Sequence, residues 1–154
     1  MRKQVRFFCS YAEKDSRLAG SLLDLLLPHL KASRKHEYVV WEFHKLLTGE
    51  RWNERILEEL AQCDFGLLFL SPEFLVSGYI KDVEIPALLK REGIIPVGLK
   101  PVDFRLQDLQ TLDQYQLFRL RTATGRLQCF SQLRGADRDA FALELFRQIE
   151  GRLG

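Results

Sequence analysis

The chain has 154 residues, a length that suits one domain with a single sizeable core. Its residues are 46% hydrophobic and 29% charged, which is ordinary for a globular protein and excludes a disordered or membrane-spanning chain. A formal net charge of +2 gives no basis for binding nucleic acid or an anionic membrane surface. The cysteines and histidines stand in no metal-ligand spacing, so we expect no metal site and reduced thiols, as in a cytoplasmic protein.

The first half of the chain predicts strands that alternate with helices. We expect a strand over 5–10, a helix over about 15–30, a second strand over 38–43 and a helix over about 51–62. Asp15 or Ser16 is expected to cap the first helix, and Trp52 is expected in the core on the Ile56 face of the second. The loop at 44–50 is expected to turn at Gly49.

The second half continues this alternation less clearly. The apolar run "FGLLFL" at 65–70 predicts a central parallel strand, and "IIPVGL" at 94–99 predicts another, with Pro96 indicating an edge or a bulge. Over 103–133 we expect only a short helix near 106–119 and a weak fifth strand in "RLQCF". Asp137 is expected to cap a last helix that ends at Gly151.

Strands that alternate with helices predict one α/β domain: a doubly wound, flavodoxin-like three-layer sandwich with a central parallel sheet of about five strands. Ligands of such sheets bind outside the carboxyl ends of the strands. The chain has no dinucleotide-binding glycine fingerprint, no GxxxxGK phosphate loop and no GxSxG elbow. The acidic residues that a response regulator needs at its strand ends are also missing.

The stretch "SPEFLVSGYIKDVE" at 71–84 places a carboxylate among apolar residues. Ser71-Pro72 predicts a helix start, and Ser77-Gly78 predicts a break before a second helical segment capped by Asp82. Glu84 then falls inside the apolar arc of that segment. Two interpretations remain open for Glu84, a functional carboxylate or a structural one paired with Arg91.

Several motifs in order resemble those of Toll/interleukin-1 receptor (TIR) domains, and most closely those of the bacterial, NAD-cleaving type. "VRFFCSYAEKD" resembles the first TIR box, and "VVWEFHKLLTGERWNERILEELAQCDFGLLFLSPEFLVSGYIKDVE" resembles the second box, the BB loop and the third strand with its helix. With "IIPVGLKPVD", the resemblance covers about residues 4–103.

The resemblance implies an NAD glycohydrolase in which Glu84 is catalytic, NAD is the substrate and no cofactor is needed. It implies a substrate pocket, for which we expect Ser10, Tyr11, Phe43, Ser77, Tyr79 and Ile80. The sequence departs from the family pattern at one position. Many members carry an aromatic residue four positions before the glutamate, where this chain has Ile80, and Tyr79 stands five before it.

The resemblance also implies activation by TIR–TIR assembly through the BB loop, where we expect Leu46, Leu47 and Gly49 to form the contact. It implies a cytoplasmic effector of prokaryotic immune and antiviral defence. Residues 1–154 are then a single TIR domain that is the N-terminal part of a larger effector or depends on a sensor domain or partner. The alternatives are a non-catalytic TIR scaffold that signals by homotypic assembly, and a TIR domain that binds a nucleotide without turnover.

Overall fold

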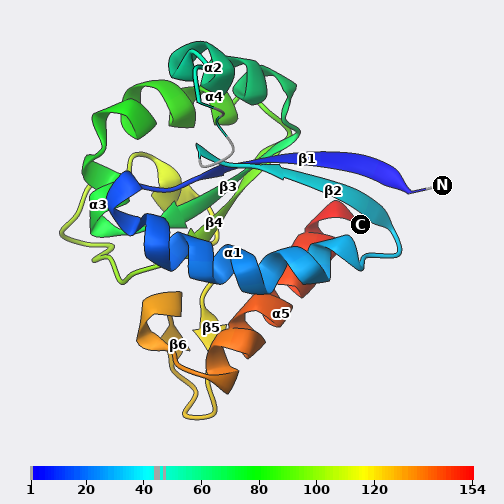
Figure 1. Cartoon of the computed structure of the whole chain (residues 1–154). Helices are drawn as coiled ribbons and strands as arrows, with labels where there is room; N and C mark the ends of the chain where they lie inside the picture. Colours follow the sequence, from blue (N-terminus) through cyan, green and yellow to red (C-terminus); the bar gives the residue numbers. More distant parts are fainter. Residues whose placement is uncertain (1, 44–45, 47) are drawn as a thin grey trace.

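Parallel strands and helices alternate along the chain, as the sequence predicts (Figure 1). The computed structural model describes residues 2–43, 46 and 48–154. Its helices and strands are β1 (Lys3–Ser10), α1 (Ser16–Lys31), β2 (His36–Trp41), α2 (Trp52–Gln62), β3 (Phe65–Leu70), α3 (Pro72–Val76), a π-helical turn (Ile80–Glu84), α4 (Ile85–Leu88), β4 (Gly93–Gly98), β5 (Leu120–Arg121), β6 (Leu127–Gln128) and α5 (Ala136–Leu153).

The main sheet is parallel and has the strand order β2-β1-β3-β4. Every residue of β3 is buried, because this strand has a neighbour on each side and helices on both faces. That position explains its uninterrupted apolar sequence. Pro96 lies on β4, which is an edge strand of the sheet, so the prediction of an edge position is confirmed. At an edge, the N–H group that proline lacks is not needed for a hydrogen bond to a neighbouring strand.

Within the described residues this sheet has four strands, and the prediction of about five is wrong in that number. The "RLQCF" segment forms β6, which pairs antiparallel with β5 in a separate two-stranded sheet. Phe118 alone bridges the edge of β4: its N–H donates to the Pro96 carbonyl at 2.9 Å, and its carbonyl accepts from the Gly98 N–H at 2.8 Å. Phe118 therefore lies where a fifth strand of the sheet would lie, but its neighbours do not extend the pairing into a strand.

The predicted helix near 106–119 is also wrong, because only a 3₁₀ turn forms there, at Leu112–Gln114. Asp103 Oδ1 instead accepts the N–H groups of Arg105 and Leu106, which competes with helical bonding. Gln110 and Thr111 then adopt φ values of 57° and 71°, which a right-handed helix excludes.

The helix ends differ from the predicted caps. Asp15 stands at the N-cap position of α1, but its side chain makes no capping bond. Gly135 holds the N-cap position of α5, so Asp137 lies in the first turn instead. The last helix also continues through Gly151 to Leu153.

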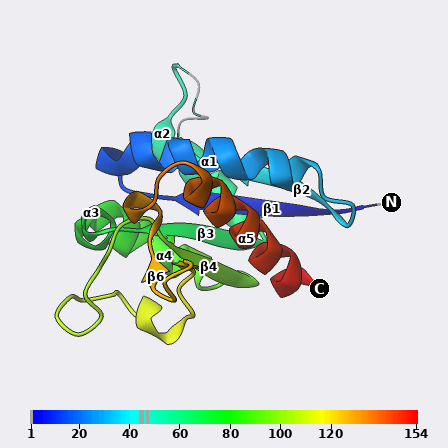
Figure 2. The same cartoon turned by 90° about the horizontal axis from the view of Figure 1, so that it is seen from below.

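The two faces of the sheet carry separate helical layers. In Figure 1, α2 and α4 lie above the sheet, and α1 and α5 lie below it; Figure 2 shows the latter pair from their own side. Successive residues of β1 alternate between these layers, so Phe7 belongs to the α1–α5 core and Phe8 to the α2–α4 core. By the same alternation Ser10 faces the α2–α4 layer. No described helix has the length and apolar character to cross a membrane.

Candidate functional site

A cavity of about 430 Å³ opens at the carboxyl ends of β1 and β2, beneath α2 and the segment that follows β3. It brings together every residue predicted for catalysis or substrate binding: Ser10, Tyr11, Phe43, Ser77, Tyr79, Ile80 and Glu84. The remaining lining residues are Phe8, Cys9, Glu13, Ser16, Trp41, Trp52 and Ile56. The position agrees with the expectation that ligands of a parallel sheet bind outside its carboxyl ends.

Glu84 reaches this cavity through an interrupted helix. Ser71 Oγ accepts the Phe74 N–H at 2.9 Å and Pro72 occupies the first turn, which confirms the predicted helix start. The helix ends at Val76, which confirms the predicted break. Helical structure resumes after Ser77 without a cap at Asp82, which lies exposed inside the π-helical turn, so that part of the prediction is wrong.

The π-helical turn sets the register between Tyr79 and Glu84. Within it the Ile85 N–H donates to the Ile80 carbonyl, a bond that spans five residues instead of four. In an α-helix, residues four apart lie on the same face. In this π-helical turn, residues five apart lie on the same face instead. Tyr79 and Glu84 therefore line the same cavity. Ile80, four residues before Glu84, lines it as well. We expect the extra residue of the turn to compensate for the shifted aromatic position in the sequence.

Glu84 is a buried carboxyl group with little to stabilise its charge. Its exposed fraction is 9%, and burial raises its pKa from 4.5 to about 7, opposed only by an interaction with Ser10. Ser10 Oγ is itself buried and has no hydrogen-bond partner of normal geometry among the described residues. Arg91 Nε donates to the Cys63 carbonyl at 2.7 Å. The predicted structural pair of Glu84 with Arg91 is not formed, and no other described cation makes an ion pair with Glu84.

Two tyrosines of the cavity are held by their hydroxyl groups. Tyr11 donates to Glu42 Oε1 at 3.2 Å, and its ring stacks on Phe69 at a centroid distance of 6.2 Å. Tyr79 donates to Asn53 Oδ1 at 2.7 Å. Burial raises the pKa of both tyrosines, so both remain neutral phenols at physiological pH.

Among the lining residues that the sequence analysis does not predict for the site, Trp52 differs most from its expected position. The sequence predicts Trp52 in the core, but 52% of its surface is exposed. The buried residues of α2 are Ile56 and Leu60. Because α2 begins at Trp52, the indole lies at the end of the helix and meets Tyr79 edge-on, at 5.4 Å and 61°. The sequence signal that could have predicted this position is an aromatic residue directly after a loop at the carboxyl ends of the strands.

The expected assembly loop is described in part. Gly49 is exposed with φ +92°, which confirms the predicted turn. Leu46 is partly buried against the α2–α4 core. Leu47 lies outside the described residues, so its role stays a prediction.

A charged cluster around the buried Asp15 follows the carboxyl ends of three strands and was not predicted. Asp15 is buried after β1, and its Oδ1 lies 2.6 Å from Lys100 Nζ, which follows β4. Ser71, at the end of β3, donates its hydroxyl to Asp15 Oδ2. The Asp15 interaction raises the pKa of Lys100 and so keeps its charge. This Asp15–Ser71–Lys100 cluster joins the carboxyl ends of β1, β3 and β4.

Two other hollows on the described surface are not lined by a buried acidic residue. One of them, of about 550 Å³, lies against β4 and the segment that carries Phe118. The other, a shallow hollow of about 700 Å³ at the amino ends of β1 and β2, is walled by charged residues, among them Arg2, Arg34 and Lys35. In the described part of the chain, no group of three or more histidine, cysteine or acidic residues is placed to hold a metal ion. The cavity with Glu84 therefore remains the candidate site.

A family model described as "TIR domain" matches residues 7–134. No curated protein matches the chain.

Proposed function

Because the chain belongs to the TIR domain family, which includes NAD-cleaving enzymes, we propose that it is an NAD glycohydrolase. The reaction breaks the bond between nicotinamide and ribose and yields ADP-ribose or a cyclised form. The observation that carries the proposal is Glu84, a buried carboxyl group with no counter-ion among the described residues, in an aromatic cavity at the carboxyl ends of the strands. Unpaired buried charges are costly in stability and are typical of functional sites.

One carboxylate suffices for this reaction. Ordinary glycosidases need a second carboxyl group as an acid, because without its proton their leaving group would have to depart as an alkoxide. The nicotinamide of NAD carries a positive charge and leaves as a neutral molecule, so it needs no proton. The Glu84 carboxylate stabilises the cationic ribosyl group that develops as the bond breaks, and its weak solvation strengthens that interaction. Since the pKa of Glu84 is about 7, the active ionised form increases as the pH rises through 7.

The decisive test compares Glu84→Gln with wild type in nicotinamide release from NAD, measured by chromatography. Gln keeps the shape of the side chain and removes the charge. If that charge contributes about 3–4 kcal/mol, turnover falls by about 10²–10³-fold. The matched control is Asp82→Asn, because Asp82 lies exposed on the same turn and does not line the cavity. A Glu84→Gln protein that cleaves NAD at the wild-type rate contradicts the proposal.

The second candidate is a TIR scaffold that acts only by homotypic assembly. This candidate is favoured by large apolar side chains that are exposed in the segments after β3 and β4: Val76 is 83% exposed and Leu106 is 86% exposed. Assembly through Leu46, Leu47 and Gly49 suits either candidate, as does a role in prokaryotic defence beside a sensor domain. The scaffold predicts no nicotinamide release at protein concentrations where light scattering shows complete assembly, whereas the enzyme predicts release that rises with assembly.

A further inference from the structure

Two buried hydrogen-bond donors line the cavity without a partner among the described residues: the Ser10 hydroxyl and the Trp41 indole N–H. Ser10 is 2% exposed and Trp41 is 5% exposed, so neither side chain is open to bulk solvent. A buried donor that makes no hydrogen bond destabilises a fold, and such groups are rare in native proteins. Each donor therefore indicates an acceptor that the cavity holds in another state of the protein.

Ser10 lies near a carboxyl group that can be this acceptor. It is the last residue of β1, its side chain faces the α2–α4 layer, and Glu84 belongs to the π-helical turn on the same side of the sheet. Both residues line the cavity, and an interaction with Ser10 lowers the pKa of Glu84, although burial raises it more. A hydroxyl bonds more strongly to a carboxylate than to a neutral carboxyl group, so this pair gains most when Glu84 ionises.

We propose, on the premise of the proposed function, that Ser10 is a positioning residue of the site: its hydroxyl donates to the Glu84 carboxylate once Glu84 ionises. This bond stabilises the charged form in surroundings where burial opposes it. Ser10 acts through Glu84 in this role and does not contact the reacting atoms. Without the hydroxyl, a smaller fraction of the protein carries the Glu84 charge at neutral pH.

The other titratable groups around Glu84 do not supply this donor. They are Cys9 on β1, Tyr11 and Glu13 after β1, Glu42 after β2 and Tyr79 before the π-helical turn. The Tyr11 hydroxyl donates to Glu42, and the Tyr79 hydroxyl donates to Asn53. Burial raises the pKa of Cys9 and of Tyr79, so both stay neutral while Glu84 ionises. The two glutamates accept hydrogen bonds when they are ionised.

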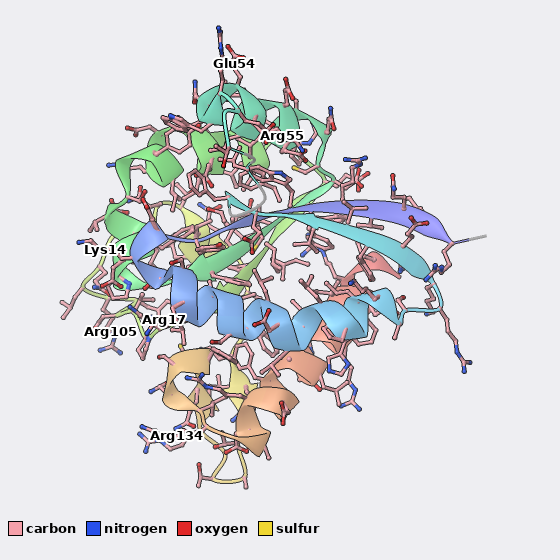
Figure 3. The ribbon with its side chains drawn as sticks, viewed as in Figure 1. Lys14, Arg17, Glu54, Arg55, Arg105 and Arg134 are labelled. Atoms are coloured by element: carbon pink, nitrogen blue, oxygen red, sulfur yellow. The ribbon has the colours of Figure 1, made fainter. Side chains whose placement is uncertain are left out.

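Charged side chains of the neighbouring segments act on Glu84 in wild type and in Ser10 variants alike. Those that the structure describes are Lys14 in the turn before α1, Arg17 at the start of α1 and Arg55 on α2, all labelled in Figure 3, and the exposed Lys81 and Asp82 of the π-helical turn. His44 and Lys45, which follow Phe43 in the sequence, lie outside the described residues and are the same in every variant. A comparison of Ser10 variants therefore isolates the contribution of the hydroxyl.

The titration of Glu84 tests the proposal without any turnover. Glutamate labelled with carbon-13 at its side-chain carboxyl gives one NMR signal for each glutamate, and the signal of Glu84 is the one missing from Glu84→Gln. We expect Ser10→Ala to lower the acid dissociation constant of Glu84 about tenfold. Ser10→Thr keeps the hydroxyl and should leave this constant within about twofold of wild type. Trp41→Phe removes the other unpartnered donor and is the matched control, for which we also expect a change of less than about twofold.

An unchanged dissociation constant in Ser10→Ala overturns the proposal, and so does an equal change in Trp41→Phe. Melting curves at pH 5, where Glu84 is neutral, separate this role from a structural one. Ser10→Ala loses a hydroxyl that has no partner of normal geometry in the structure, so we expect it to melt no earlier than wild type. A Ser10→Ala protein that melts much earlier at pH 5 shows that the hydroxyl serves the fold, which contradicts the proposal.

Turnover separates this inference from the proposed function. Because only the ionised form acts, we expect Ser10→Ala to lower kcat/KM for NAD about tenfold at pH 6 and less than about threefold at pH 9. A loss of equal size at both pH values assigns the hydroxyl to substrate binding; it overturns the inference and leaves the proposed function standing. If the assembled wild-type protein releases no nicotinamide, the proposed function fails, and the NMR titration still decides whether Ser10 bonds to the Glu84 carboxylate.

Discussion

Glu84 links function to stability because its environment favours the neutral form. Its pKa is 4.5 in an ordinary setting and about 7 in the folded protein, a difference that corresponds to about 3 kcal/mol. Between these pH values the folded protein holds a proton that the unfolded chain releases. The stability contributed by neutral Glu84 is therefore complete below pH 4.5 and is lost as the pH rises through 7.

Glu84→Gln should accordingly become more favourable for stability as the pH rises, since Gln is neutral throughout. We expect the free energy of unfolding of the variant, relative to wild type, to be about 3 kcal/mol higher at pH 8 than at pH 4.5. Urea unfolding of both proteins at the two pH values measures this difference. A difference that does not change with pH would show that Glu84 ionises as freely as an exposed carboxylate.

At the scale of elements, the π-helical turn is what keeps Tyr79 beside Glu84. Deleting the exposed Lys81 removes the extra residue and converts the turn to α-helix, with Tyr79 and the glutamate four residues apart. We expect this variant to release nicotinamide within about threefold of wild type. Inserting one alanine after Lys81 is the matched control, because it rotates Tyr79 about 100° from the glutamate and should abolish turnover. Loss of activity in the deletion variant would contradict the compensating role of the turn.

The sequence predicts regular elements well where apolar residues recur with a clear period. "FGLLFL" and the leucines of α1 have one plausible environment each, and both elements form as expected. The region from 103 to 133 lacks such a period, and its course depends on local bonds from Asp103 and on two residues with positive φ that no glycine marks. In the site, strand ends indicate Ser10 and Tyr11. The exposure of Trp52 and the π-helical turn depend on tertiary packing, which a single sequence does not reveal.

At the scale of the whole molecule, the site depends on strand ends that are distant in sequence and held in one place. The Asp15–Ser71–Lys100 cluster fastens three of these ends together from residues that follow β1, β3 and β4. Ser71 also caps α3, which leads into the segment that carries Glu84. The same cluster therefore supports both the sheet and the wall of the cavity.

Lys100→Met tests this support, because it leaves the carboxylate of Asp15 buried without its cation. Because the Lys100 side chain is 34% exposed, we expect a loss of about 1–3 kcal/mol, less than for a fully buried pair, and urea unfolding measures it directly. Adding Asp15→Asn removes the orphaned charge while leaving an oxygen to accept the Ser71 hydroxyl, so the double variant should recover part of the loss. Lys90→Met, at an exposed lysine without an ion pair to any described residue, should change stability by less than about 0.5 kcal/mol. If Lys100→Met lowers the free energy of unfolding no more than Lys90→Met does, the three strand ends are held by packing alone and the cluster does not stabilise the fold.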